Sequence, residues 1–502
     1  MSLKLRIIRC VVGLAGLVLS SIGVAEERPN IIVIFTDDHG WADLGAQGVL
    51  EDVQTPHLDV MAESGVRFTS GYITAPQCIP SRAGILSGQY QQRFGVDDNR
   101  FSPMPFEVLT IPERLKEVGY TTGMVGKWHL DPNVASEEWL TENTYKGKPL
   151  PPQNKRRIPL ADLLPYKTSN QGFDDHFEGY IYDYWANYDL EGRSITAKRV
   201  RTEERDRLDI QSDAALAFID RNHDKPFFLY LSYFAPHVPL ESTEKYLSRF
   251  PRSTGSGQAG EMPERRRYAL AMLSAVDDGV GRIREQLHAY GQLENTLIFF
   301  IGDNGAPLKF TMEDRPLSFK GGAWDGSMNV PLNGEKGMLS EGGVRVPYLI
   351  SWPNKITDGI VSDIPVSSLD VGATVVQLAG LDKDAALDGE NLFDLLTEPS
   401  KAQTRPIYWR FWGQAAIRLG QWKYLRAGGK EYLFDLNHDI SESTNLLKVE
   451  PAVADTLRNR WADWNADLVR PFDGRDGGLN DQEVKFYAHY FGDTHTPESS
   501  AP

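Results

Sequence analysis

The sequence predicts an α/β fold with a smaller α+β unit at its C-terminal end. Several short apolar runs are continuous rather than alternating, which is typical of strands buried on both faces of a mostly parallel sheet. Helical segments lie between these runs, and such βα alternation is characteristic of α/β proteins. At 502 residues the chain also exceeds what one core usually holds, so a second unit is expected.

The elements of the predicted sheet and its helices follow one another along the chain. The apolar runs expected as strands are residues 30–35, 121–126, 225–234, 296–302 and 346–351. The helical patterns lie at residues 55–68, 110–119, 267–291 and 368–380. Irregular, polar or Pro-rich stretches at 131–170, 250–264 and 305–336 are expected as insertions over one face of the sheet.

The pattern changes after about residue 403. Residues 415–439 carry short runs around a Gly turn, as in an antiparallel meander, and residues 450–468 have an amphipathic helical pattern. We therefore predict a main domain over residues 26–402 and a small subdomain with an antiparallel sheet and a helix over residues 403–502.

Residues 1–25 have the pattern of a secretory signal peptide. A basic start is followed by the apolar run VVGLAGLVLSSIGVA, which ends in small residues. The run is shorter than the ~20 residues of a membrane span, so cleavage after Ala25 is favoured over a retained anchor. We expect a periplasmic or secreted protein without membrane attachment. The net charge of −16 argues against nucleic acid as a partner.

Cleavage would leave one cysteine, Cys78, because Cys10 lies in the signal segment. Secreted chains normally use cysteine in pairs, so Cys78 is a reactive thiol, half of an intermolecular disulfide, or a small buried residue. Pro80 suits the first position of a helix, and Cys78 is then expected just before the helix N-terminus, where the dipole favours negative charge.

Polar side chains follow four of the predicted strands. They are Asp37, Asp38, Lys127, His129, His237, Asp303 and Asn304. Ligands of open α/β sheets bind beyond the carboxyl ends of the strands, so these groups are expected in one site.

The aspartates and Asn304 offer hard oxygen atoms, which suit Ca²⁺, with Mg²⁺ as the second choice. Lys127, Lys336 and Arg82 add positive charge, so the site would attract a sulfate or phosphate although the whole chain is acidic. A thiolate at Cys78 would be an odd partner for such an ion, because Ca²⁺ prefers oxygen.

The stretch CIPSRAGILSG, which begins at Cys78, resembles the C-x-P-S-R-x-x-x-L-[ST]-G signature of the formylglycine-dependent sulfatases. The resemblance extends, in family order and over nearly the whole mature chain, through NIIVIFTDDHGWADLG, TPHLDVMAESGVRFTSGY, GKWHL, APHVP, IGDNGAP, EKGMLSEGGVRVP and YLFDLNHDISESTNL. It implies an alkaline-phosphatase-like fold, with a large α/β/α domain and a small antiparallel subdomain.

The resemblance also implies a modified residue and a metal. Cys78 would be oxidised to formylglycine (3-oxoalanine) by a formylglycine-generating or an anaerobic sulfatase-maturating enzyme. The residues expected to bind Ca²⁺ are Asp37, Asp38, Asp303, Asn304 and the modified Cys78. Arg82 would hold the hydrated aldehyde, and His129 would assist it. Lys127, Lys336 and His237 would bind the sulfate ester.

In the mechanism that the resemblance implies, one hydroxyl of the hydrated aldehyde attacks sulfur and expels the alcohol, leaving a covalent sulfo-enzyme. His237 is the first candidate for the general acid and Lys336 the second. His129 then deprotonates the second hydroxyl, and sulfate leaves as the aldehyde forms again.

A sulfated carbohydrate is the expected substrate, because the chain is exported and its loops carry aromatic, amide and carboxylate groups suited to sugars. The candidate substrate-binding residues are Asp97, Asp98, Arg100, His176, Tyr182, Trp185 and Trp324. Small aryl sulfates are the alternative, as is phosphodiester or phosphonate hydrolysis on the same fold. A non-catalytic glycan-binding protein and a dimer linked through Cys78 are hypotheses of other classes.

Overall fold

The computed structural model describes residues 28–202, 205–251, 262–308, 315–320, 322–382, 384–470 and 480–492. The predicted signal peptide lies outside these residues, as do parts of the insertions predicted at 250–264 and 305–336. Within the described ranges, no helix has both the length and the apolar character that crossing a membrane requires.

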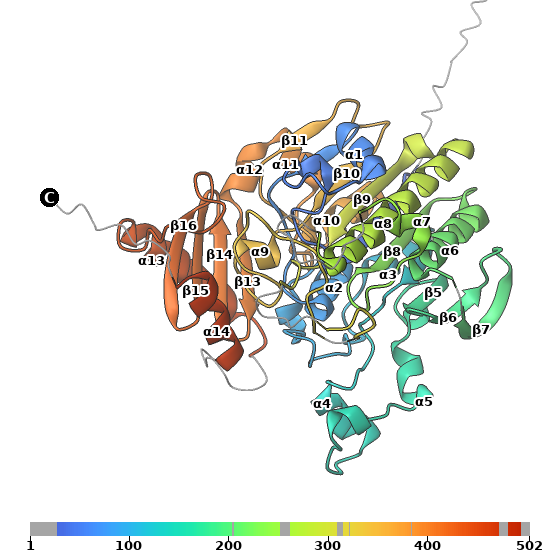
Figure 1. Cartoon of the computed structure of the whole chain (residues 1–502), viewed down its shortest axis with the longest axis horizontal. Helices are drawn as coiled ribbons and strands as arrows, with labels where there is room; N and C mark the ends of the chain where they lie inside the picture. The colour runs from blue at the N-terminus through green and yellow to red at the C-terminus, as the bar shows by residue number, and fades with distance from the viewer. Residues whose placement is uncertain are drawn as a thin grey trace, which may run out of the picture.

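A ten-stranded mixed sheet forms the centre of the main domain, in the order β11-β2-β10-β9-β1-β8-β4-β5-β6-β7 (Figure 1). Its strands are β1 Asn30–Asp37, β2 Val66–Phe68, β4 Thr121–Gly126, β5 Asp175–Tyr180, β6 Asp183–Tyr188, β7 Ser194–Arg201, β8 Phe227–Pro236, β9 Thr296–Gly302, β10 Tyr348–Ser351 and β11 Ile360–Ser362. A separate short pair joins β3 Gly71–Tyr72 to β12 Val366–Ser367. Each of the five predicted strands is present.

The middle of the sheet is parallel, as predicted. Strand β1 runs parallel to both β8 and β9, and β4 runs parallel to β8 and β5. Strands β10, β6 and β7 are antiparallel to their inner neighbours. Every residue of β1, β8 and β9 is buried, which explains why these strands appear in the sequence as unbroken apolar runs.

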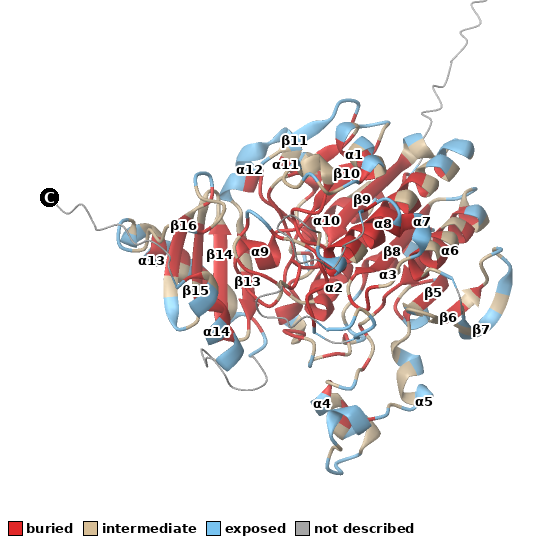
Figure 2. Cartoon of the chain, viewed as in Figure 1, coloured by how far each residue is buried: buried red, intermediate tan, exposed pale blue. Residues whose placement is uncertain are grey.

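Helices cover both faces of the sheet. One face packs against α1 Pro56–Glu63, α6 Arg207–Asn222, α7 Glu244–Leu247 and α8 Glu264–Ala289. The other packs against α2 Cys78–Ser87, α3 Ile111–Lys116, α10 Leu369–Leu378 and α11 Leu392–Thr397. Alternate side chains of β1 belong to the two cores, with Ile32 and Ile34 on the first face and Ile31 and Val33 on the second. Figure 2 shows the buried strands enclosed between these layers.

Two segments differ from the sequence prediction. His176 and Trp185 were expected on loops, but they lie in β5 and β6, which widen the sheet, and only Tyr182 lies in the turn between these strands. Tyr184 and Tyr188 alternate into the core and are fully buried, so aromatic packing stabilises this edge of the sheet. Helix α6 was not predicted. It buries Leu208, Ala215 and Phe218 at helical spacing.

The remaining helical elements of the main domain are short. They include α4 Glu137–Trp139, a π-helical turn Leu140–Thr144, α5 Leu160–Leu163, α9 Glu341–Val344 and α12 Pro399–Thr404. The 3₁₀ turns are Gly45–Gln47, Gln91–Phe94, Gln153–Lys155, Leu164–Tyr166, Thr168–Asn170 and Leu293–Asn295. The region of α4 and α5 belongs to the insertion predicted at 131–170, and it projects from the domain with much of its surface exposed (Figure 2).

The C-terminal unit is a four-stranded antiparallel meander with helices. Its strands are β13 Pro406–Phe411, β14 Gln414–Leu419, β15 Trp422–Ala427 and β16 Lys430–Asp435, followed by α13 Pro451–Ala466 and α14 Asp481–Tyr490. Helix α13 packs through Leu457 and Trp461 against Ile417 and Leu433 of the sheet. Strand β13 and helix α14 were not predicted, whereas the meander and α13 were.

Candidate active site

The carboxyl ends of four adjacent strands converge on one buried site. Asp37 ends β1, Asp303 follows β9, Lys127 follows β4 and His237 follows β8. The sheet order β9-β1-β8-β4 makes these strand ends neighbours. Residues nearly 270 positions apart in sequence therefore contact one another, and the backbone N–H of Asp38 donates to Oδ1 of Asp303 over 3.0 Å.

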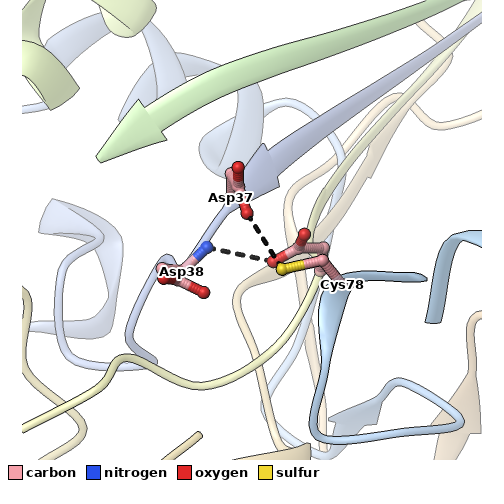
Figure 3. A group of neighbouring side chains, drawn as sticks. Asp37, Asp38 and Cys78 are labelled. Carbon is pink, nitrogen blue, oxygen red and sulfur yellow. Dashed lines mark hydrogen bonds between the residues drawn. The ribbon is translucent and has the colours of Figure 1, made fainter. Parts of the chain in front are cut away.

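Three carboxylates and the cysteine form the floor of this site. The ligand atoms of Asp37, Asp38, Cys78 and Asp303 all lie within 4.8 Å of one another, and all four residues are buried. In Figure 3 Asp37 and Asp38 leave the end of β1 and the Cys78 sulfur faces Asp37, with Sγ 3.5 Å from Oδ1. Asp38 has φ +61°, a left-handed conformation that bends the chain where its carboxylate is needed.

Cys78 is the first residue of α2, so the helix begins two residues earlier than Pro80, where the sequence placed its start. Proline is tolerated within the first turn, because the N–H groups there have no partner inside the helix. Burial raises the pKa of Cys78 to about 12, despite the lowering effect of Lys127 and Lys336. Desolvation therefore outweighs the helix dipole on which the sequence argument relied, and the unmodified thiol is neutral.

Each carboxylate of the site has its own cation. Lys127 Nζ lies 2.5 Å from Oδ2 of Asp37, and Lys336 Nζ lies 2.5 Å from Oδ1 of Asp38. Lys336 Nζ is also 3.4 Å from the Cys78 sulfur. These contacts place two ammonium groups around the reactive position.

Arg82 joins helix α2 to the sheet. Its Nη2 donates to Oδ2 of Asp303 over 2.7 Å, and its Nη1 donates to the backbone oxygen of Lys127 and to the hydroxyl of Ser232. Ser232 was not singled out from the sequence, although a serine inside the apolar strand LYLSYF is a usable signal. Arg82 therefore acts as a brace between α2, β4, β8 and β9.

The pKa values of Asp37 and Asp303 are shifted in opposite directions from the usual value of an aspartate. Burial disfavours ionisation of Asp37, but Lys127, His237 and Arg82 outweigh it and hold the pKa of Asp37 well below its usual value. Burial, together with the charge of Asp37, raises the pKa of Asp303 to about 7. Three carboxylates this close cannot all ionise easily without further positive charge.

His237 and His129 also lie beside the charged groups of the site. Nδ1 of His237 is 2.7 Å from the backbone oxygen of Val238, which fixes the proton on Nδ1 and leaves Nε2, 3.7 Å from Oδ2 of Asp38, for a ligand. Burial lowers the pKa of His237 to about 4. His129 has φ +60°, and its buried Nδ1 has no hydrogen-bond partner. Burial and Lys127 hold the pKa of His129 well below its usual value.

The donor set fits a hard divalent cation. Three aspartates supply carboxylate oxygens, and Asn304 supplies an amide whose Nδ2 already donates to Asp38 and to the backbone of Gly305. Its Oδ1 is buried and has no hydrogen-bond partner. Oxygen donors of this kind are ligands of Ca²⁺, whereas the sulfur of unmodified Cys78 suits that ion poorly. An oxygen at position 78 would complete the set.

The predicted substrate residues fall into different places. Asp98 and Arg100 line a cavity of about 380 Å³ beside the start of α2, and Trp185 lines another of about 330 Å³ together with Trp128 and Tyr180. The other four do not line these cavities. Asp97 pairs with Arg410, His176 is buried in β5, Tyr182 donates to Glu241, and the buried indole of Trp324 donates to the backbone of Ser327.

The chain belongs to the sulfatase family and is a sulfuric ester hydrolase. The family model named Sulfatase matches residues 29–381, and a second model, N-sulphoglucosamine sulphohydrolase, C-terminal, matches residues 334–463. The fold agrees with this assignment.

Curated relatives include an arylsulfatase of Hemicentrotus pulcherrimus, 31% identical over 415 residues that cover 79% of this chain and 67% of that protein. The N-acetylgalactosamine-6-sulfatase of Homo sapiens is 32% identical over 423 residues, which cover 80% of this chain and 72% of that protein. Among solved structures, Ps i-CgsB in complex with k-i-k-neocarrahexaose has a TM-score of 0.71 and 29% identity, covering 89% of this chain and 94% of that one.

Proposed function

We propose that this protein is an exported sulfatase that removes sulfate from a sulfated carbohydrate, with Cys78 as the site of formylglycine and with Ca²⁺ as its metal. The observation that carries the proposal is the setting of Cys78. Its sulfur lies 3.5 Å from Asp37 and 3.4 Å from Lys336, in a group of oxygen ligands, at the start of the CIPSRAGILSG segment. A neutral thiol is a poor nucleophile and a poor ligand here, whereas an oxygen-bearing residue suits both roles.

Asp37, Asp38, Asp303 and Asn304 would hold the cation, which when bound supplies positive charge beside the oxygens of a sulfate group. Formylglycine at position 78 would supply a hydroxyl as nucleophile. Lys127 and Lys336 neutralise an anion held over position 78, and both side chains are already fixed by ion pairs with Asp37 and Asp38. Arg82 keeps α2 in register with the strand ends.

Two imidazoles are available for proton transfer. Because Nδ1 of His237 is bound to the backbone oxygen of Val238, Nε2 is the atom that faces a substrate, and it is our first candidate to protonate the leaving alcohol. Lys336 is the second, because its ammonium lies 3.4 Å from the Cys78 sulfur. His129 follows the same strand as Lys127, and its unpartnered Nδ1 suits the removal of a proton from residue 78.

A carbohydrate substrate is supported by two kinds of relative. Several curated relatives are named N-acetylgalactosamine-6-sulfatase, and one solved neighbour is in complex with k-i-k-neocarrahexaose. The relative named arylsulfatase supports small aryl sulfates as a second candidate.

The test is a matched pair of proteins produced together with a formylglycine-generating enzyme, the wild type and Cys78→Ala. Mass spectrometry of the peptide around residue 78 should show an aldehyde in place of the thiol in the wild type. Released sulfate is then measured on a panel of defined sulfated oligosaccharides and on 4-nitrophenyl sulfate. Turnover by a protein that carries only the thiol would refute the formylglycine proposal, and turnover of the aryl ester alone would refute the carbohydrate proposal.

A further inference from the structure

The cavity beside the start of α2 is built from two units of the molecule. The main domain contributes Gln77 and the loop Asp98–Arg100, and the C-terminal subdomain contributes Trp412 and the start of α14, residues 480–482. The volume is about 380 Å³, which accommodates a sugar ring. None of these subdomain residues was expected in a site from the sequence.

The cavity wall is attached to the residues on either side of Cys78. The backbone N–H of Ile79 donates to Oδ1 of Asn99 over 3.2 Å, and the backbone N–H of Asn99 donates to Oε1 of Gln77 over 3.3 Å. A ligand in this cavity therefore lies against the same loop that fixes the position of residue 78.

The polar groups of the cavity are held in place before any ligand arrives. Asp98 is almost fully buried and accepts hydrogen bonds from Arg100 Nη2 at 2.6 Å and from the indole nitrogen of Trp412 at 3.2 Å. The Arg100 side chain remains 44% exposed, so the guanidinium can bind a ligand while its carboxylate partner orients it. Such preorganised pairs add specificity, because little entropy is lost on binding.

Trp412 is held in a strained backbone conformation next to Asp98. Its φ is +50°, which is uncommon for a large side chain, and its ring stacks on Phe411 at 4.4 Å between centroids. Glu483 of α14 accepts hydrogen bonds from the backbone N–H groups of Gly413 and Gly428 and so fixes α14 to the turn that carries Trp412. The subdomain thus presents an indole and the start of α14 as one rigid wall.

We propose that this cavity is a sugar-binding subsite that takes an uncharged pyranose ring of the substrate, with Trp412 and Asp481 as specificity-determining residues. The proposal rests on the proposed function and names the part of the substrate that the C-terminal subdomain recognises. Among the residues that the structure describes, the lining carries two carboxylates, Asp98 and Asp481, against one cation, Arg100, so a second sulfate is disfavoured there. An aromatic face with amides and carboxylates instead matches the C–H face and the hydroxyls of a neutral sugar.

The test separates binding from turnover. Unsulfated oligosaccharides of galactose and of N-acetylgalactosamine are titrated calorimetrically into the unmodified wild-type protein and three variants. Trp412→Gly removes the indole and relieves the positive φ, and Asp481→Asn removes one exposed charge at nearly constant shape. Lys485→Ala, on an exposed part of α14 outside the cavity, is the matched control.

We expect the first two variants to weaken binding ~10- to 100-fold, because each removes a central contact of the subsite, and the control to bind as the wild type does. The same two variants are then made with formylglycine at position 78. Their kcat/KM for the oligosaccharide substrate should fall below that of the wild type, whereas their kcat/KM for 4-nitrophenyl sulfate should stay within ~2-fold of it. Absence of binding by the wild type, equal binding by all variants, or an equal loss on both esters would overturn the subsite. If the protein carries verified formylglycine and binds these sugars but releases no sulfate, the subsite proposal stands and the proposed sulfatase function is refuted.

Discussion

This molecule contains two buried clusters of opposite charges that are built from similar residue types. The first, which we propose to be catalytic and call the catalytic cluster, comprises Asp37, Asp38, Asp303, Arg82, Lys127 and Lys336. The docking cluster comprises Glu341, Glu442, Arg345, Arg418 and Lys423 and joins the main domain to the C-terminal sheet. In both, the acidic side chains are almost completely removed from solvent.

The charged groups of the docking cluster are paired with one another. Lys423 Nζ lies 2.8 Å from Glu341 and 2.9 Å from Glu442, and the backbone N–H of Glu341 donates to Glu442 over 2.7 Å. The second oxygen of Glu341 accepts from the Tyr72 hydroxyl and from Arg345. Internal partners thus compensate these charges, which is what a structural cluster requires.

The catalytic cluster is open by contrast. Asn304 Oδ1 and His129 Nδ1 are buried there and have no hydrogen-bond partner. Burial of charge alone therefore does not distinguish a reactive site from a structural joint in this protein. Buried polar atoms with neither a hydrogen bond nor an ion pair do distinguish them, because such atoms are costly unless a ligand satisfies them. Oε1 of Glu442 in the docking cluster also accepts no hydrogen bond, but it is ion-paired with Lys423 at 2.9 Å.

The largest expected effect is a loss of activity without a loss of stability, caused by a substitution beside the catalytic cluster. Cys78→Ala should lower kcat by at least ~10⁴-fold on any sulfate ester, because no other group in the proposed mechanism can replace the nucleophile. The melting temperature should stay within a few degrees of the wild type, because the residue contributes little packing. Sulfate release and differential scanning fluorimetry check both statements. A variant with wild-type turnover would contradict the assignment.

The second largest effect is a lower free energy of unfolding when the docking cluster loses its central lysine. Lys423→Met leaves two buried carboxylates without their shared cation and should lower the free energy of unfolding by ~3–5 kcal/mol. Chemical denaturation measures it. Lys430→Met, at the exposed start of β16, is the matched control and should be nearly neutral. Similar losses in both variants would show that the buried contacts of Lys423 do not matter.

A third prediction tests whether the catalytic cluster is a metal site. Saturating Ca²⁺ should stabilise the protein by ~2.7 kcal/mol at a hundredfold excess over Kd, because the ion binds only the folded chain. Asp303→Asn should abolish this gain. Asp278→Asn should retain it, because Asp278 belongs to a second acidic group, with His57 and Asp277, in which it pairs with Arg249. Calorimetric unfolding with Ca²⁺ and with a chelator decides the point, and loss of the gain in both variants would count against the assigned site.

The smallest effect is a pH dependence of the docking cluster. Burial raises the pKa of Glu442 from 4.5 to about 7 despite Lys423, so between these pH values the folded protein holds this proton more tightly than the unfolded chain does. The associated stability is present below pH 4.5 and is lost as pH rises through about 7. At ~1.4 kcal/mol per pH unit, Glu442→Gln should have gained ~2 kcal/mol on the wild type by about pH 6. Unfolding at several pH values tests this, with exposed Glu398→Gln as the control; parallel curves for Glu442→Gln and the wild type would contradict it.

The sequence predicted the central sheet well and its edges poorly. Strands β1, β8 and β9 are apolar throughout because both of their faces are buried, and no tertiary information is needed to recognise them. Strands β5 and β6 carry acidic and amide residues and hold their place by burying tyrosines, which local pattern alone did not indicate.

The residues of the site were also predicted well in one part and poorly in another. The residues proposed for chemistry sit directly after strands or in a short motif, so their positions could be found from sequence. Of the substrate candidates, adjacent Asp97 and Asp98 have opposite fates: Asp97 pairs with Arg410 of the subdomain, whereas Asp98 lines a cavity. No sequence pattern distinguishes them, because the difference depends on which neighbour each side chain meets in the folded chain.

The fold class, the family and the groups gathered at the strand ends could be inferred from the amino-acid sequence, because buried strands and short motifs are encoded by residues close together in the chain. Which charges are compensated and which polar atoms lack partners depends on contacts that form in the folded protein. Tertiary contacts also bring Trp412 and the start of α14 to the loop beside Cys78. These contacts join segments more than 300 residues apart, and their energies depend on burial and distance, which exist only in the folded protein.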